Sequence, residues 1–181
     1  MVQLGGSSGR PKNRLFWSQS MTFTQGFFRA GEVTATALNV YPNPLPIGRE
    51  RHQYGDGPFA RLKMPSLPNF PGVYLWDVDN EIVYVGQSRT PLSRRLGPNG
   101  YSSISNYNTF ARQKGRTNGG QQTNCRINAL ANKALSSGQV IAIWYCITSA
   151  EEAASVEAQW MATFGMPRWN RRDERSNIRE S

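Results

Sequence analysis

The feature that most constrains the fold is the stretch from Pro71 to Leu96, where two β-type segments are followed by a glycine and a short basic segment. Residues 73–78 and 82–85 are rich in β-branched and aromatic side chains, and the Asp79-Asn80 pair between them favours a turn. This pattern predicts a β-hairpin.

A short basic helix is predicted directly after the hairpin. Gly86 ends the second strand, Thr90 can cap a helix, and Pro91 suits the first helical position. The helix would carry Arg94 and Arg95.

Three more elements follow from hydrophobic periodicity. Residues 124–137 carry an apolar stripe at helical spacing, and residues 139–147 form an apolar strand. Ser149 opens a capping box for a last helix, which should end at Gly165. Together with the hairpin, these elements predict an α/β (α+β) domain over residues 69–172, with a small three-stranded antiparallel sheet flanked by helices.

The segments outside this domain are more polar. Residues 1–20 are expected to form a flexible basic N-terminus, and residues 21–68 an accessory segment with a pair of strands and a long loop. Residues 173–181 form a polar tail. The arginines near this end either contact nucleic acid or belong to a frayed terminus.

The charge distribution indicates a polyanionic partner. The chain has 21 Lys and Arg residues against 12 Asp and Glu, and 17 of the basic residues are arginine. No acidic residue occurs between Glu81 and Glu151. Since arginine makes bidentate contacts to phosphate, this interval is expected to bind nucleic acid, the alternative being a solvated basic face. The candidate DNA-binding residues are Arg89, Arg94, Arg112, Lys114, Arg116 and Arg126.

The remaining composition narrows the class of protein. Cys125 and Cys146 are the only cysteines and lie in no His or Cys cluster, so neither a zinc site nor a disulfide framework is expected. The longest apolar run, residues 140–147, is too short to cross a bilayer, and there is no apolar signal segment. A cytoplasmic protein with no membrane partner is the expectation.

Two triplets in the hairpin, Gly72-Val73-Tyr74 and Tyr84-Val85-Gly86, resemble the two halves of the GIY-YIG nuclease signature, with Val in place of Ile in each. Arg95, Glu157 and Asn170 then follow in the order that this family requires, with Arg95 in a Leu-x-x-Arg-Leu pattern. The spacing of eleven positions from Tyr84 to Arg95 is similar to that in the small restriction-type members.

The resemblance implies a metal-dependent endonuclease that hydrolyses DNA phosphodiester bonds, of the restriction kind or the phage and mobile-element kind. It implies that Glu157 is the sole carboxylate ligand of one Mg²⁺ or Mn²⁺ ion, that Arg95 binds the scissile phosphate, and that Asn170 fixes the local backbone. Tyr74 would act as the general base or only orient the attacking water. Tyr84 would orient the phosphate or Tyr74.

Double-stranded DNA is the expected partner, and because one site cuts one strand, a homodimer is considered. The alternatives are a non-catalytic DNA-binding module that retains the fold and an enzyme that acts on RNA. A binding module needs the arginines but has no use for a metal-binding Glu157, which favours the enzyme.

The resemblance also requires Tyr74 and Tyr84 to lie on one face of the sheet. Because side chains alternate between faces, a two-residue loop would place Tyr84 opposite Leu75, on the wrong face. We therefore predict a three-residue loop. It would place Tyr74 opposite Tyr84 and Trp76 opposite Ile82, and direct Val73, Leu75, Val83 and Val85 to the core.

Residues 97–122 are rich in Gly, Asn, Ser and Tyr and are long for a structureless loop, which indicates a functional segment. Tyr101, Tyr107 and Phe110 either clamp nucleic acid with the neighbouring basic residues or pack the loop onto the core. His52, the only histidine, precedes the hairpin and is not expected to be catalytic.

Overall fold

The structure is a computed structural model in which residues 26–97, 101, 110–116 and 121–171 are described. The flexible segment predicted for residues 1–20, the tail predicted for 173–181 and the predicted clamp residue Tyr107 lie outside the described residues.

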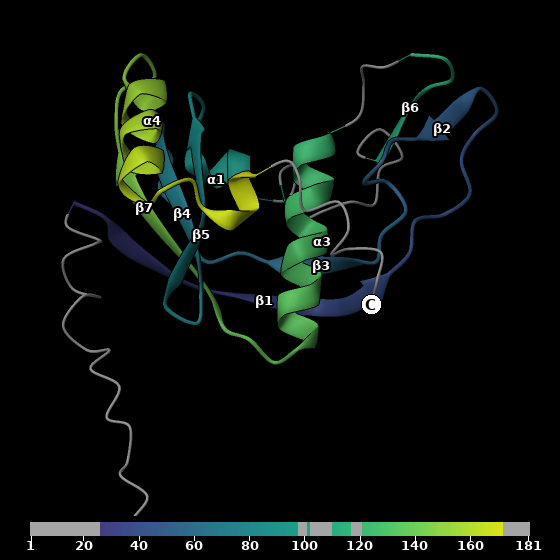
Figure 1. Cartoon of the computed structure of the whole chain (residues 1–181), viewed down its shortest axis with the longest axis horizontal. Helices are drawn as coiled ribbons and strands as arrows, with labels where there is room; N and C mark the ends of the chain where they lie inside the picture. The colour runs from purple at the N-terminus through teal and green to yellow at the C-terminus, as the bar shows by residue number, and fades with distance from the viewer. Residues whose placement is uncertain (1–25, 98–100, 102–109, 117–120, 172–181) are drawn as a thin grey trace, which may run out of the picture.

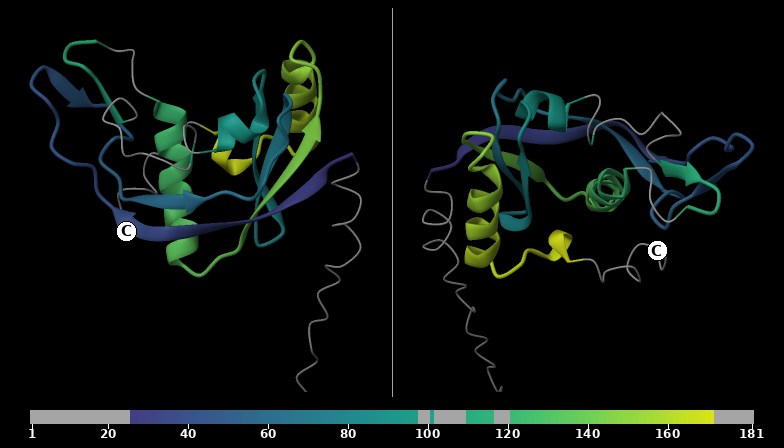
Figure 2. Two further views of the ribbon diagram at one scale, coloured as in Figure 1. Left: turned by 180° about the vertical axis from the view of Figure 1, so that it is seen from behind. Right: turned by 90° about the horizontal axis from the view of Figure 1, so that it is seen from above.

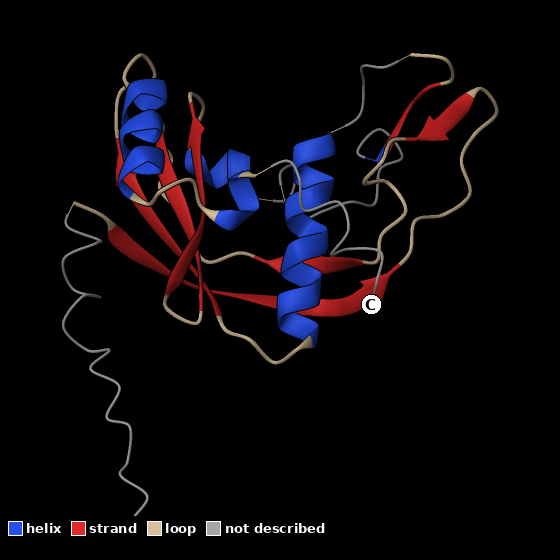
Figure 3. Ribbon diagram, viewed as in Figure 1, coloured by secondary structure: helices blue, strands red, loops and turns tan. Residues whose placement is uncertain are grey.

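A five-stranded antiparallel sheet forms the centre of the molecule (Figures 1 and 3). Its strand order is β3-β1-β7-β4-β5. The strands are β1 (Phe28–Val40), β3 (Phe59–Lys63), β4 (Gly72–Val78), β5 (Glu81–Ser88) and β7 (Ile141–Ile147).

The prediction of a mixed α/β fold with an antiparallel sheet is confirmed, but the prediction of three strands is wrong. β1 pairs with β7 on one side and with β3 on the other, so two strands from the segment predicted to be accessory belong to the central sheet. The alternating sequence of β1 predicted a strand but not its partner. One of its two partners, β7, follows it by about a hundred positions in the chain.

Helices cover both faces of this sheet (Figure 2). Among the described residues they are α1 (Leu92–Leu96), α3 (Gln122–Ser136), α4 (Ala153–Thr163) and the short 3-10 helix η1 (Arg168–Asn170). The helices predicted from periodicity correspond to α3 and α4. No helix in the described part of the chain combines the length and apolar character needed to cross a bilayer.

The two faces have different cores. On one face, Ile127 and Leu130 of α3 pack in a cluster that contains Tyr74, Trp76 and Ile143. On the other face, α4 contributes the partly buried side chains Val156, Trp160, Met161 and Phe164, which pack against Val73, Leu75 and Val85. The tyrosines of the β4–β5 hairpin therefore lie on the α3 face.

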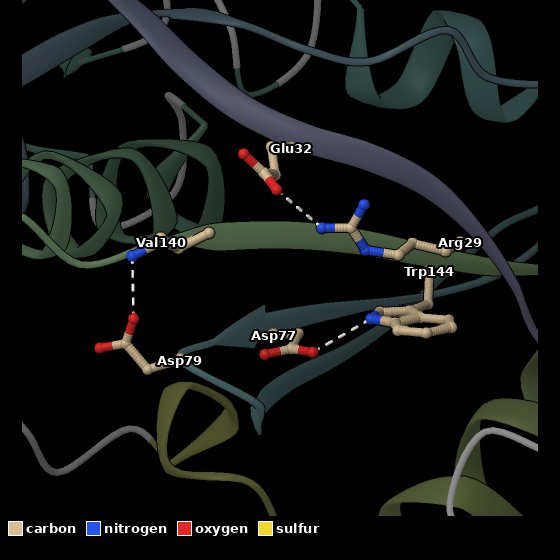
Figure 4. A network of polar contacts seen from close by, with 6 residues as sticks. All are labelled: Arg29, Glu32, Asp77, Asp79, Val140 and Trp144. Atoms are coloured by element: carbon tan, nitrogen blue, oxygen red, sulfur yellow. Dashed lines mark hydrogen bonds and ion pairs between the residues drawn. The ribbon is translucent and has the colours of Figure 1, made fainter. Parts of the chain in front are cut away.

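The hairpin closes through a two-residue turn, so the predicted three-residue loop is wrong. Val78 pairs with Glu81, and the two residues between them, Asp79 and Asn80, have positive φ angles of 52° and 69°, as a type I′ turn requires. The Asp79 carboxylate accepts a hydrogen bond of 2.9 Å from the Val140 N–H, which ties the turn to the start of β7 (Figure 4).

A β-bulge returns Tyr84 to the face of the sheet that carries Tyr74, whereas the two-residue turn alone would have placed it on the opposite face. Asp77 pairs with Ile82 but Trp76 pairs with Tyr84, so Val83 is the extra residue on β5. Tyr84 consequently shares a face with Tyr74, and their ring centroids are 6.2 Å apart.

The bulge also moves Val83 out of its predicted place. Val83 packs in the same cluster as the tyrosines, not with Val73, Leu75 and Val85 on the opposite face. The predicted pairs of Tyr74 with Tyr84 and Trp76 with Ile82 are wrong for the same reason, since Tyr74 pairs with Gly86.

A second, smaller antiparallel pair stands apart from the sheet. β2 (Arg49–Arg51) and β6 (Ala111–Gln113) form a two-stranded element, here named the β2–β6 ribbon. It lies on the far side of α3 from α4 (Figures 1 and 2).

Candidate active site

Three phenols and one guanidinium meet on the α3 face of the sheet, and we name Tyr74, Tyr84, Arg95 and Tyr101 the tyrosine–arginine cluster. Tyr101 lies at its centre. The Tyr101 hydroxyl is 2.8 Å from the Tyr74 hydroxyl and 3.5 Å from the Tyr84 hydroxyl, and it accepts a hydrogen bond of 3.1 Å from Arg95 Nη2. β4, β5, α1 and the segment after α1 each contribute one member.

The phenols of this cluster are closed to solvent. Tyr74 and Tyr101 are each 0% exposed and Tyr84 is 7% exposed. Burial raises the pKa of Tyr74 well above its ordinary value, and the neighbouring Tyr84 raises it further, while the Arg95 charge lowers it by less. Tyr74 is thus a neutral phenol at neutral pH.

Arg95 is held between Tyr101 and α3. Its Nη1 donates to Asn124 Oδ1 at 3.1 Å, and its Cζ lies 4.8 Å from the centroid of the Tyr101 ring. Burial acts to lower the pKa of Arg95, but Tyr74 and Tyr101 outweigh it and the pKa is raised, so the guanidinium stays charged. Arg94, the other arginine of α1, is exposed.

The side chain of Asn124 is oriented by Gln121, three positions earlier in the chain. Its Nδ2 donates to the side-chain oxygen of Gln121, so its Oδ1 is left to accept from Arg95. A buried amide in the first turn of α3 therefore positions the guanidinium.

Two side chains from the C-terminal part of the chain hold the outer edge of β5, the last strand of the sheet. Asn170 of η1 donates to the Val85 carbonyl at 2.7 Å and accepts from the Val85 N–H at 2.8 Å. Glu157 of α4 accepts a hydrogen bond from the Gln87 N–H. Both occupy positions where a sixth strand would otherwise pair.

Glu157 is half-buried at this edge, and its surroundings shift the pKa of its carboxyl. Burial raises the pKa of Glu157, while the Gln87 N–H and the Arg95 charge lower it by less. The carboxylate is therefore close enough to Arg95 for the two charges to interact, although α4 covers the opposite face of the sheet.

The described residues contain no group of three or more His, Cys, Asp or Glu side chains that would enclose a metal ion. Mg²⁺ often binds proteins through one or two carboxylates and keeps waters and substrate phosphates as its other ligands. Glu157 fits such an ion, because a cation would favour the charged form that burial disfavours. Gln87 Oε1, also buried and without a hydrogen-bond partner in the described structure, is a neutral oxygen on the residue whose N–H donates to Glu157.

Both glycines of the signature triplets occupy places where a β-carbon does not fit. A β-carbon on Gly72 would lie 2.2 Å from the Cys146 carbonyl oxygen, and one on Gly86 would lie 2.6 Å from Tyr74 Cζ. Glycine is therefore required by packing at both positions, against β7 at Gly72 and against Tyr74 at Gly86.

The predicted DNA-binding residues divide into separate groups. Arg89 and Arg94 are exposed near α1, and Arg126 on α3 donates to the Arg171 carbonyl at 3.2 Å. Arg112 on β6 forms an ion pair of 2.8 Å with Glu50. Lys114 and Arg116 are exposed just beyond β6.

The described aromatic residues of the segment after α1, His52 and the two cysteines are all partly or fully buried. Tyr101 and Phe110 are both buried, so of the two alternatives for these aromatic residues the described structure favours packing over clamping. His52 is buried, and its Nδ1 accepts from the Tyr54 N–H at 3.2 Å. Burial raises the pKa of the Cys125 thiol to about 12, and Cys125 and Cys146 are free thiols.

Sequence reasoning weighed Tyr101 only as a clamp for nucleic acid or a packing residue, and it included neither Tyr101 nor Asn124 among the predicted catalytic residues. A tyrosine six positions after Arg95 in a polar loop, and an asparagine on the buried stripe of a helix, are the signals that the sequence offers for them. Neither signal specifies which partner the side chain meets.

Comparisons with protein families, with curated proteins and with solved structures gave no match for this chain.

Proposed function

We propose that this protein is a metal-dependent endonuclease that hydrolyses DNA phosphodiester bonds at a GIY-YIG-type site. One observation carries the proposal. Tyr74, Tyr84 and Arg95 form one cluster, and Glu157, which lies more than sixty positions after Arg95, is within range of the Arg95 charge.

Arg95 is proposed to bind the scissile phosphate. A guanidinium carries five N–H donors, and the hydrogen bonds to Asn124 and Tyr101 leave donors for an anion. Since those two bonds fix its plane, Arg95 can stabilise charge that develops on the phosphoryl oxygens without first reorganising.

Tyr74 is proposed to position Arg95 through Tyr101 and not to remove a proton from the attacking water, because its side chain is fully buried. A tyrosine that acts as a general base needs a phenol pKa lowered towards neutrality, whereas burial raises the pKa of Tyr74. Its hydroxyl lies 2.8 Å from the Tyr101 hydroxyl, the same group that accepts from Arg95.

Glu157 is proposed to hold the metal ion from the edge of β5. A bound Mg²⁺ would polarise the phosphate and stabilise the departing oxygen. Asn170 supports this arrangement by pairing with Val85, one position before Gly86 of the signature.

The second candidate is a DNA-binding module without catalysis. The observation that favours it is the complete burial of the Tyr74 and Tyr101 side chains, which suits a packed core as well as a site. The two candidates differ in one property, since only the enzyme requires Glu157.

The test is incubation of the full chain with supercoiled plasmid, with Mg²⁺ or with EDTA, followed by sequencing of the ends. The enzyme predicts nicked or linear DNA with Mg²⁺ only, and loss of cleavage in Arg95→Ala. Arg61→Ala, at an exposed position on β3, is the matched control and should cleave normally. Equal cleavage by Arg95→Ala and Arg61→Ala would contradict the proposal.

A further inference from the structure

The β2–β6 ribbon contributes no residue to the candidate active site. The ladder continues past its strands, because the Lys114 N–H donates to the Gly48 carbonyl at 3.0 Å. Two turns then close at the same end, where the Arg49 N–H bonds to the Pro46 carbonyl at 3.2 Å and the Arg116 N–H to the Gln113 carbonyl at 3.1 Å. The end of the ribbon is thus formed by residues 46–48 and 114–116.

This end combines an exposed apolar side chain with positive charge. Ile47 is 105% exposed, the most exposed large apolar residue of those described. Lys114, whose N–H bonds to the Gly48 carbonyl, and Arg116 are exposed at the same end of the ribbon. Residues 46–51 and 111–116 contain five basic residues and a single acidic one, Glu50, which is already paired with Arg112.

The base of the ribbon is fixed to the rest of the fold. Phe110 and Ala111 pack in a cluster with Cys125 and Ala129 of α3. Arg51 donates to the carbonyls of Pro42 and Asn43 at 3.3 Å and 3.0 Å, which holds the connection from β1 against β2. The exposed end is therefore presented on a rigid support.

We propose that the β2–β6 ribbon enters the major groove of duplex DNA and selects where the candidate active site cuts, a role that rests on the proposed function. The major groove of B-form DNA admits a two-stranded ribbon. Arg49 and Gln113 are exposed and directly opposite each other, and they are side-chain types that read guanine and adenine. Ile47 is suited to contact thymine methyl groups, and Lys114 and Arg116 to contact phosphates.

The same geometry argues against an RNA duplex. The major groove of A-form RNA is deep and too narrow for side chains to read. A ribbon that reads the major groove should therefore discriminate between the two duplexes.

The ribbon and the candidate active site are connected through neighbouring residues of α3. Asn124 accepts the hydrogen bond from Arg95, and the next residue, Cys125, packs against the base of the ribbon. DNA held by the ribbon would thus lie at a fixed position relative to Arg95.

The experiment measures binding of the full chain to a labelled random-sequence DNA duplex in EDTA, which excludes cleavage. The double variant Lys114→Ala/Arg116→Ala should weaken binding about 10-fold and reduce the salt dependence by about two counterions. Its control, Arg61→Ala/Lys63→Ala on β3, removes the same charge elsewhere and should change binding less than about 2-fold. Ile47→Ala should weaken binding about 5-fold with an unchanged salt dependence, whereas Ile147→Ala should have no effect.

Equal weakening by the two double variants would overturn the proposal, because binding would then follow overall charge. Unchanged binding by Ile47→Ala, or equal affinity for an RNA duplex of the same composition, would also overturn it. Thermal melting identifies any variant that fails to fold. If the wild type binds through the ribbon but does not cut with Mg²⁺, the proposed nuclease function fails and the ribbon assignment remains.

Discussion

Gly86 lies directly opposite Tyr74 in the β4–β5 ladder, and a β-carbon on Gly86 would come within 2.6 Å of both Cζ and the hydroxyl oxygen of Tyr74. The same β-carbon would lie 2.7 Å from Tyr84 Cε1. The rings of Tyr74 and Tyr84 thus occupy the space that a side chain at position 86 would need.

Gly86→Ala should displace both tyrosine rings and lower the free energy of unfolding by about 1–3 kcal/mol, the usual cost of overpacking. Urea unfolding measures this change. Because the clash is with Tyr74, the effect should be strongly non-additive with Tyr74→Leu in a double-mutant cycle. Simple additivity would show that Gly86 is required for another reason.

Tyr101→Phe should lower the free energy of unfolding by about 1–2 kcal/mol, since the Tyr74 hydroxyl and Arg95 Nη2 both lose their partner in a buried place. The ring contact with Trp76, at 5.5 Å between centroids, is kept. If the cluster is catalytic, cleavage should fall in parallel. Tyr41→Phe, at a position that is 67% exposed, is the control and should change neither property.

Glu157→Gln should leave the melting temperature at pH 7 unchanged or raise it. Burial raises the pKa of Glu157, so the contribution of this group to stability is present in acid and is lost as the pH rises through the raised pKa. The amide oxygen of Gln can still accept from Gln87. The gain should disappear at about pH 4, where the wild-type carboxyl is protonated. A lower melting temperature at pH 7 would contradict this account.

Asn170→Ala should lower the free energy of unfolding by roughly 1–3 kcal/mol, because the edge of β5 loses both hydrogen bonds at Val85. Asn170→Asp should also be destabilising, since a carboxylate cannot donate to the Val85 carbonyl. Asn43→Ala, at an exposed position, is the control. If Asn170→Ala is as stable as the wild type in chemical unfolding, Asn170 does not support the edge of β5.

Local signals predicted much of this fold. The turn residues Asp79 and Asn80, the apolar stripe of α3 and the capping box at Ser149 each specify structure through neighbours in sequence. The structure has the turn and the stripe. At Ser149 it has one half of the capping box, since Ser149 Oγ accepts from the Glu152 N–H at 3.2 Å, but Glu152 Oε2 accepts from Ser149 Oγ and α4 begins only at Ala153.

The sequence predictions were wrong where the structure depends on contacts between segments that lie far apart in the chain. The bulge at Val83 depends on how β5 pairs with β4, and no residue type in the sequence predicts it. The pairing of β1 with β7 and of β2 with β6 depends on contacts across long stretches of chain. In the candidate active site, residue order led to Tyr74, Tyr84 and Arg95, whereas the central position of Tyr101 required three-dimensional contacts.

The most direct test of the central claim compares cleavage and binding of plasmid DNA by the wild type and Glu157→Ala in Mg²⁺. The account predicts that Glu157→Ala binds DNA with an affinity within about 3-fold of the wild type and loses cleavage by at least about 10²-fold, because the proposed metal ligand is gone. Cleavage by Glu157→Ala at the wild-type rate would contradict it.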